Sequence, residues 1–475
     1  MKNKKWISDI SVLFDPTFDI FGYTLKYCED NPEMNPTEFS KIILSVKAIE
    51  TREIGVISLD HSLDIDEVTE IFIRINSKGT PLSQSDFVMS KMAADEVHGG
   101  SMMRKAIDYF SHLVVKPEFY SNLNHDKEFM ESKYADKLKW LAHDYDDIYD
   151  PNFGDMIRVS FMHKFGRGKL SDLVSLLSGR DFITKEFKEE IVEESYEKMD
   201  EGILNFMNKY NFTQFVMAIK GAGFSSSKLI KSQMALNFAY CLYLMLLSEP
   251  DIPNEQIKRY VQKWFVMSIL TRRYSGSTES QMDRDMRNIS EKGFIEYFKD
   301  VEESNLSDTF WNITLPQELE TSSLSSPGFN VFVAAQVNRN SNSMLMNGLK
   351  VTDILSMNGA ADVHHIFPKA YLINNGIDLK TKYNQVANYI YLDTQVNKAI
   401  SDDAPNEYFG KVFKQCDTKE INIGNITDID LLKTNLKENC IPEGTESMTF
   451  ENFDEFLIKR RMSMAKFIEE YYKNL

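Results

Sequence analysis

The chain has 475 residues, of which 43% are hydrophobic and 26% charged, and its formal net charge is −17. This length exceeds what one hydrophobic core usually supports, so we expect two or three domains. Contacts with nucleic-acid phosphates need lysine and arginine side chains. The acidic balance therefore excludes a protein that is basic over its whole surface, and it leaves only a local basic site open.

Cysteine usage and the spread of apolar residues indicate a cytoplasmic protein. The four cysteines form no CxxC pair and have no regular spacing, which favours reduced thiols over disulfides or a zinc site. Asp9 and Asp15 interrupt the N-terminal region before a signal core arises. The most apolar run, at residues 235–247, is shorter than the about 20 residues of a membrane span. We therefore expect a buried helix there and no contact with a membrane.

Residues 1–95 are expected to mix strands and helices. The patterns predict strands at residues 6–14 and 54–59, and helices at residues 41–51 and before a turn at residues 76–79. A new helix should begin at Ser83 or Ser85, because Ser83 and Asp86 match a capping box.

Residues 96–325 are expected to be helical. Helical periodicity is present at residues 104–115, 134–145, 185–208, 228–247 and 254–270. Basic and aromatic residues alternate from Arg158 to Lys169, which suits a nucleic-acid surface or, as we favour, a solvated helix face over packed aromatic rings. The polar loop at residues 272–283 contains Arg273, which would bind an anion or, as we favour, pair with acidic residues that fix two helices.

A small and polar stretch at residues 321–328 predicts a boundary, followed by a third domain at residues 326–475. The last helix is expected at residues 450–475 and carries Lys459, Arg460 and Arg461. These cations would contact a phosphate backbone or, as we favour, form a solvated face.

Two adjacent histidines and two asparagines give the strongest chemical signal. His364 and His365 are two of only eight histidines, and Asn388 and Asn397 follow them. Neighbouring residues of a strand point to opposite sides, so one imidazole can bind a metal while the other faces a water. This order and spacing are those of an HNH nuclease site, in which a strand pair and a helix surround one divalent metal. The alternative is that the histidines are ordinary strand residues and the asparagines are caps.

Phosphodiester hydrolysis needs a base, an electrophile and stabilisation of the leaving oxygen. We assign His365 as the general base. His364 and Asn397 are assigned as ligands of Mg²⁺, with Mn²⁺ as the natural substitute. Asn388 would orient the base or tie the loop between the strands.

The charge around this stretch is locally less negative than in the rest of the chain. Residues 362–398 contain four lysines, among them Lys369 and Lys398, and three aspartates, which gives a local charge of +1. The two named lysines are candidates for DNA contacts. Asp362 and Asp393 are candidate partners of the metal ligands.

Three segments resemble one family. Residues 364–369, 388–392 and 397–401 read HHIFPK, NYIYL and NKAIS, and they resemble the C-terminal HNH module of GmrSD-type, modification-dependent (type IV) restriction endonucleases of bacteria. Residues 72–83 resemble the second half of that family's N-terminal GmrS-like domain. Residues 273–280 resemble a signature of its helical middle.

The resemblance implies a fold, an activity and partners. The fold would be mainly α with a small α+β part: a partial GmrS-like (ParB-like) α/β domain at residues 1–95, a helical domain at 96–325 and a ββα-metal (HNH) domain at 326–475. The activity would be cytoplasmic cleavage of phage-type DNA with modified, often glucosylated hydroxymethyl, cytosines. A single HNH site nicks one strand, so a homodimer is expected.

The chain departs from that family at one motif. An Asp-Gly-Gln-Gln-Arg run of the N-terminal domain is absent here. Either the chain is a fragment, or a separate N-terminal subunit supplies this half, or nucleotide dependence has been lost, so a nucleoside triphosphate is not expected to bind this chain alone. The alternative function is a non-catalytic DNA-binding or regulatory subunit of a split restriction complex, and an RNase is a third.

Overall fold

The computed structural model describes residues 6–7, 9–53, 55–56, 58–60, 71, 82–143, 148–182, 184–356 and 363–475. It is mainly helical, with 67% helix and a small two-stranded antiparallel sheet, so the predicted mainly α class is confirmed. Contacts divide the chain into two compact units, Met1–Gly79 and Thr80–Leu475. Among the described residues, no helix has both the length and the apolar character needed to cross a membrane.

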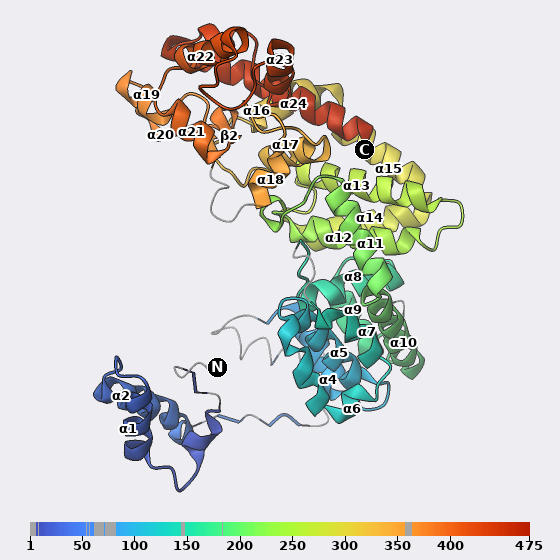
Figure 1. The fold of residues 1–475 in the computed structure, drawn as a ribbon. Helices are drawn as coiled ribbons and strands as arrows, with labels where there is room; N and C mark the ends of the chain where they lie inside the picture. Colours follow the sequence, from blue (N-terminus) through green and yellow to red (C-terminus); the bar gives the residue numbers. More distant parts are fainter. Residues whose placement is uncertain are drawn as a thin grey trace. The chain divides into compact units, whose positions relative to one another are not determined.

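The N-terminal unit, shown in blue in Figure 1, is helical where it is described. Its elements are η1 (Ser11–Phe14), α1 (Ile20–Asp30), α2 (Pro36–Lys47) and η2 (Ala48–Thr51). Leu13, Phe39 and Ile43 form a small core of their own. The Tyr27 ring stacks on Phe39 with the ring centroids 4.0 Å apart.

The strands predicted in this unit are wrong where the structure describes them. The described residues of 6–14 and 54–59 contain no strand. Asp9 instead accepts a hydrogen bond from the Ser11 backbone N–H at 2.8 Å, and Asp15 does the same for Thr17 at 2.7 Å. Such local bonds favour turns over extended backbone. Residues 72–81, which carry most of one family motif, lie outside the described residues.

The larger unit begins with α4 (Gln84–Ala94), whose start was predicted correctly. The Ser83 side chain accepts from the Asp86 N–H, and the Asp86 side chain accepts from the Ser83 N–H, which completes the capping box. Further elements follow: α5 (Gly100–Leu113), η3 (Pro117–His125), α6 (Lys127–Met130), α7 (Ala135–Leu138), η4 (Lys139–Ala142), α8 (Phe153–Phe165), α9 (Leu170–Leu177), α10 (Glu189–Phe206), α11 (Lys209–Gly221), η5 (Ser227–Leu229), α12 (Gln233–Leu246), α13 (Asn254–Leu270), α14 (Thr278–Lys292) and α15 (Phe294–Asn305).

The predicted helices agree with these elements to different degrees. Helix α13 has the predicted bounds, and α12 is buried along its length as its apolar run indicated. Helix α10 begins at Glu189 rather than at residue 185, because Lys185 has a φ of 63° in a turn. The helix predicted at residues 134–145 is divided between α7 and η4, and residues 144–147 lie outside the described residues.

The C-terminal part of this unit carries the sheet. Its elements are the π-helix η6 (Phe310–Thr314), α16 (Leu315–Glu318), α17 (Pro327–Asn338), α18 (Val351–Ser356), β1 (Val363–His365), α19 (Lys369–Asn374), α20 (Lys380–Tyr383), η7 (Val386–Asn388), β2 (Tyr389–Tyr391), α21 (Thr394–Ile400), α22 (Pro405–Thr418), α23 (Ile429–Glu438), η8 (Thr445–Ser447), η9 (Phe450–Asn452) and α24 (Phe453–Asn474).

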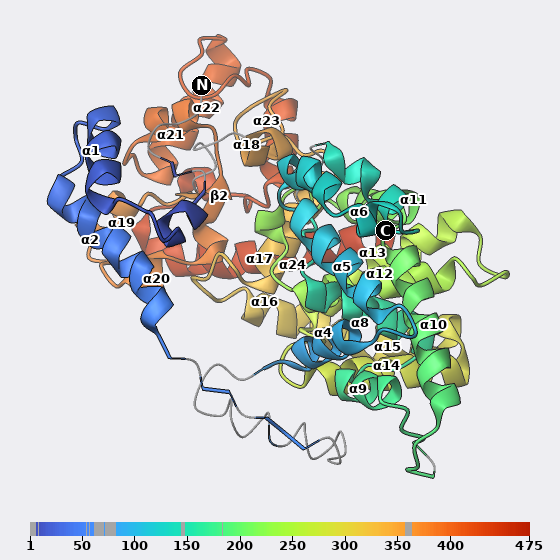
Figure 2. The same cartoon turned by 90° about the horizontal axis from the view of Figure 1, so that it is seen from below.

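Helix α24 connects the sheet region to the preceding helices. It packs along α16, α17 and η7, as the red ribbon in Figures 1 and 2 shows. Near its end, the Tyr471 hydroxyl donates to the Ala222 carbonyl at 2.5 Å, and the Tyr472 hydroxyl donates to Glu302 at 2.7 Å. Helix α24 is therefore anchored to the helical part by direct hydrogen bonds, and one continuous core includes this helix and the sheet region.

Candidate functional site

The two strands place the histidines beside an aromatic strand. β1 and β2 pair antiparallel, with His364 opposite Ile390 and His365 opposite Tyr389. β-branched and aromatic residues favour such a pleated, half-buried surface. The His365 ring meets the Tyr389 ring edge-on, with the centroids 5.2 Å apart. Neighbouring strand residues point to opposite faces, so the two imidazoles are directed to different sides of the sheet.

His365 has a defined partner that the sequence did not indicate. Its Nε2 lies 2.9 Å from Oδ1 of Asn384. A carboxamide oxygen only accepts hydrogen bonds, so Nε2 carries the proton of a neutral ring and Nδ1 keeps its lone pair. Burial lowers the pKa of His365 from its usual value, the bond to Asn384 opposes this shift, and the charge of Lys369 adds to it. The ring is therefore neutral at pH 7 and has the form that a base requires.

The side chain of Asn388 bonds to backbone groups of the loop between the strands, and none of these hydrogen bonds is to His365. Its side chain is fully buried. Oδ1 accepts from the Phe367 N–H at 2.8 Å, while Nδ2 donates to the carbonyls of Phe367 and Tyr383 at 3.1 and 3.2 Å. Of the two roles expected for Asn388, these bonds match the tie of the loop between the strands. Its place among the catalytic residues is therefore that of a positioning residue.

Helix α21 follows β2 and carries two further predicted residues. Asp393 caps the helix, because its Oδ1 accepts from the backbone N–H groups of Gln395 and Val396 at 2.9 and 3.2 Å. Asn397 is half-buried and Lys398 is exposed on this helix. Asp393, expected as a partner of a metal ligand, thus has a structural role as a cap.

The donor set fits a cation that takes few ligands from the protein. His364 and Asn397 are both half-buried, and their side chains carry imidazole nitrogens and a carboxamide oxygen. Mg²⁺ keeps several waters and accepts few protein ligands, so this set suits it. Among the described residues, no group of three or more His, Cys, Asp or Glu side chains is placed to hold a metal ion. Asp362 lies outside the described residues.

A buried arginine holds the outer side of β2. Arg460 of α24 is fully buried, and its Nη1 donates to the carbonyls of Ala387 and Tyr389 at 2.9 and 2.8 Å. The Asn388 carbonyl between them accepts from the Ile366 N–H at 2.9 Å. The Asn388 carbonyl therefore bonds to the residue that follows β1, while the carbonyls on either side of it bond to Arg460. Arg460 occupies the edge of β2 where a third strand would bond. The solvated face predicted for the last helix is wrong at this residue.

Arg273 lies in a buried network of the helical part. Its guanidinium donates to both carboxylate oxygens of Asp285, at 2.8 and 2.5 Å, and to the Tyr297 hydroxyl at 3.0 Å. Asp285 also accepts from Tyr274 and Gln281. The network connects the loop before α14 to α14 and α15, so the second interpretation of this loop is confirmed for Arg273. Its role is a structural contact.

The basic cluster predicted between Arg158 and Lys169 is largely neutralised inside the molecule. Arg158 pairs with Glu279 at 2.9 Å, and Lys164 pairs with Glu201 at 2.8 Å. His163 lies under the surface, and burial lowers its pKa to about 4. The solvated face favoured for this cluster is therefore wrong at Arg158 and His163, whose side chains are largely buried. The packed aromatic side is confirmed at Phe161, which is fully buried.

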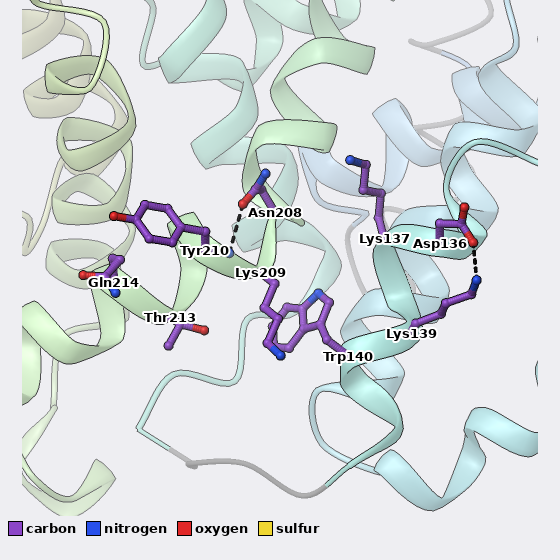
Figure 3. A pocket seen from close by; sticks show the side chains of 9 residues that line it. All are labelled: Asp136, Lys137, Lys139, Trp140, Asn208, Lys209, Tyr210, Thr213 and Gln214. Carbon is purple, nitrogen blue, oxygen red and sulfur yellow. Dashed lines mark hydrogen bonds and ion pairs between the residues drawn. The ribbon is translucent and has the colours of Figure 1, made fainter.

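A shallow basic and aromatic depression lies between η4 and the start of α11 (Figure 3). It has a volume of about 550 Å³, and Lys137, Lys209 and the largely exposed Tyr210 line it together with Trp140. The third lysine, Lys139, pairs with Asp136 at 2.5 Å. Basic side chains beside exposed aromatic rings are the combination that binds single-stranded nucleic acid. Its residues are far apart in sequence, so no local pattern predicted it.

Comparison with known proteins gives one distant similarity. No family model matches the chain, and no solved structure matches it. The chain is similar to the uncharacterized protein MJ0686 of Methanocaldococcus jannaschii, with 27% identity over 238 residues. The match covers 46% of this chain and 38% of the relative, so the chain spans well under half of the relative's length.

Proposed function

We propose that this protein is a metal-dependent DNA endonuclease of the HNH type. The observation that carries the proposal is the neutral His365 ring on β1, with Nε2 bound to Asn384 and Nδ1 left to act as a base. The order of the elements supports a ββα-metal arrangement: both histidines lie on β1, β2 pairs with β1, and Asn397 lies on the following helix α21.

The chemistry follows from the placement of each side chain. His365 Nδ1 takes a proton from a water, the water oxygen forms a bond to phosphorus, and the bond to the 3′ oxygen breaks. His364 and Asn397 would hold Mg²⁺ or Mn²⁺, which supplies positive charge to the phosphate and the leaving oxygen when bound. Asn384 fixes the tautomer of His365, and Asn388 fixes the backbone of the loop.

The substrate and partners extend this proposal through the family resemblance. We propose modified, phage-type DNA with glucosylated hydroxymethyl cytosines as the substrate, in a GmrSD-type (type IV) restriction system of the cytoplasm. A homodimer would allow both strands to be cut, and a separate N-terminal subunit would supply a nucleotide-binding half.

A nicking assay tests the function. Supercoiled plasmid should become open-circular with Mg²⁺ or Mn²⁺ and stay intact with EDTA. Phage DNA with glucosylated cytosines should be cut faster than the same DNA without the modification. Absence of cutting on every DNA with both metals would refute the endonuclease assignment, and faster cutting of RNA would move it to the RNase class.

Replacing Asn384 with alanine is expected to lower kcat roughly 10- to 100-fold, the range for outer-shell partners, with little change in KM. The reason is that the ring loses the acceptor that fixes its tautomer. The bond to Asn384 raises the pKa of His365, so its loss should also shift the pH–rate midpoint to lower pH. Asn375→Ala, an exposed asparagine after α19, is the matched control. An unchanged pH profile in Asn384→Ala would contradict this role.

A non-catalytic DNA-binding subunit is the second candidate, and the depression in Figure 3 favours it, because that surface is separate in sequence from the histidines. The double variant Lys137→Glu/Lys209→Glu should weaken DNA binding and reduce the salt slope by about one for each lysine. Lys116→Glu/Lys299→Glu makes the same charge change at other exposed positions and should bind nearly as the parent does. Equal losses in both variants would show a general charge effect instead of a surface at the depression.

A further inference from the structure

A second cavity lies among three helices of the larger unit, away from the histidines in sequence. Its volume is about 580 Å³, which is enough for a phosphate ester with a nucleoside-sized group. The start of α12, the end of α13 and the start of α17 surround it, together with the loop before α17. The lining residues that matter here are Lys231, Ser232, Ser268, Arg272, Ser326 and Asn330.

Two buried hydroxyls in this lining lack partners. Ser268 is 2% exposed and Ser326 is 7% exposed. Neither Oγ has a hydrogen-bond partner among the described residues. A buried polar group without a partner costs free energy, and native structures rarely retain one without a reason. A bound ligand with acceptor oxygens would supply the missing partner to both hydroxyls.

The charge of the lining selects an anion. Lys231 and Arg272 are exposed at its edge, and the described lining contains no carboxylate. This is unusual for a chain with a net charge of −17.

Two helix N-termini add to this preference. α12 and α17 both begin at the cavity, and the N-terminus of a helix attracts anions through its free N–H groups and dipole. Ser232 caps α12 by accepting from the Ala235 N–H at 3.2 Å. Ser326 stands at the same position of α17 and makes no capping bond. The first turn of α17 therefore has no side-chain cap, and Pro327 at its first position has no N–H to offer.

We propose that this cavity binds the phosphate group of a phosphate ester. Lys231 and Arg272 neutralise its charge, and Ser268 and Ser326 donate their hydroxyl hydrogens to its oxygens. The phosphate comes either from the DNA backbone or from a soluble phosphate ester such as a nucleotide, and both share this chemistry. The site stands on its own geometry and does not depend on the nuclease assignment.

The cavity is also connected to η7 and β2, the segment that pairs with the strand of His365. The Val386 N–H donates to the Thr321 carbonyl at 2.8 Å, and the Tyr389 hydroxyl donates to the Ser322 carbonyl at 3.4 Å. Phe329 of α17 stacks on Tyr391 of β2, with centroids 6.2 Å apart. A phosphate that orders the loop at residues 321–326 therefore acts on β2 through these contacts.

Thermal unfolding of the full chain with inorganic phosphate tests the site. A ligand that binds only the folded state raises the midpoint temperature with its concentration. Phosphate also stabilises proteins non-specifically, so each titration is compared with the double variant Lys231→Gln/Arg272→Gln at the same ionic strength. We expect at least about tenfold weaker phosphate binding in that variant.

The serine variants separate binding from folding. Ser268→Ala and Ser326→Ala remove unpartnered hydroxyls, so they should leave the stability of the ligand-free protein unchanged or raised while weakening phosphate binding about tenfold. Ser160→Ala removes another buried, unpartnered hydroxyl on α8 that does not line this cavity, and it should leave phosphate binding unchanged. A purely structural role would give the opposite pattern, with lost stability and unaltered binding.

The source of the phosphate is decided by comparing a nucleoside triphosphate, inorganic phosphate and a short DNA duplex. If the parent binds the nucleotide and inorganic phosphate and the double variant does not, the ligand is a soluble phosphate ester. If the parent binds only DNA and the double variant does not, the ligand is the DNA backbone. If the parent and the double variant bind the nucleotide, inorganic phosphate and DNA with equal affinity, the proposal is overturned. His365→Ala should bind phosphate as the parent does. A parent protein that binds phosphate and nicks no DNA would remove only the nuclease assignment.

Discussion

Replacing His365 with alanine is expected to abolish metal-dependent nicking, with the rate reduced by about 10² to 10⁴, the contribution of a positioned general base. The 2.9 Å contact between Nε2 of His365 and the acceptor oxygen of Asn384 assigns the ring proton to Nε2 and leaves the lone pair of Nδ1 for the water. Burial lowers its pKa, so the parent's rate should rise with pH and level off below about pH 6.5, the usual value for histidine. Initial nicking rates from pH 4.5 to 8 measure both effects.

His364→Ala is the matched control for this experiment, because the neighbouring imidazole is assigned to the metal. It should raise the Mg²⁺ or Mn²⁺ concentration needed for half-maximal rate without moving the pH midpoint. Circular dichroism and the midpoint of thermal unfolding establish that both variants are folded. If His365→Ala cuts as fast as the parent, another group is the base, and the role of Asn384 is lost with it.

Local patterns predicted the parts of this fold that depend on neighbours in sequence. The capping box of Ser83 and Asp86 and the bounds of α13 follow from contacts within one helical turn. The strand predicted at residues 6–14 is wrong because Asp9 and Asp15 bond to nearby backbone N–H groups, and these turns outweigh the alternation.

The spacing of residues in the sequence predicted only part of the candidate site. The order of the histidines and asparagines predicted a strand pair followed by a helix, which β1, β2 and α21 form. Asn384 could not be chosen from the sequence, because its approach to His365 depends on how the intervening turns fold. The lysines of the depression in Figure 3 come from α7 and α11, and only the packing of these helices brings them together.

The burial of Arg460 could have been predicted from helical periodicity, but the run of basic residues around it favoured a solvated face instead. It lies four residues after Phe456 and four before Met464, both of which are buried, so helical periodicity places it on the inner face of α24. Its neighbours in sequence are the exposed or paired cations Lys459 and Arg461. A run of basic residues usually forms a solvated face, but the 3.6-residue period assigns these three residues to different faces.

Replacing Arg460 with alanine should lower the free energy of unfolding by about 4 kcal/mol, the sum expected from a large core cavity and from carbonyls that lose their donors. Burial lowers the pKa of Arg460 to about 10, so the side chain stays charged at neutral pH and its donors remain available. Its bonds to Ala387 and Tyr389 hold the outer edge of β2, opposite the strand with His365. Chemical denaturation measures the loss, and nicking by the folded fraction should fall as well.

Two further variants distinguish the clamp from simple packing. Arg460→Met fills the space and removes the cost of burying a charge, but it leaves the carbonyls of Ala387 and Tyr389 without these donors, so we expect a smaller loss of about 2 kcal/mol. Lys459→Ala, the neighbouring exposed cation paired with Glu455 at 2.7 Å, should change stability by less than about 1 kcal/mol. If Arg460→Met were as stable and as active as the parent, the hydrogen bonds to β2 would be dispensable, and α24 would support the site by apolar packing alone.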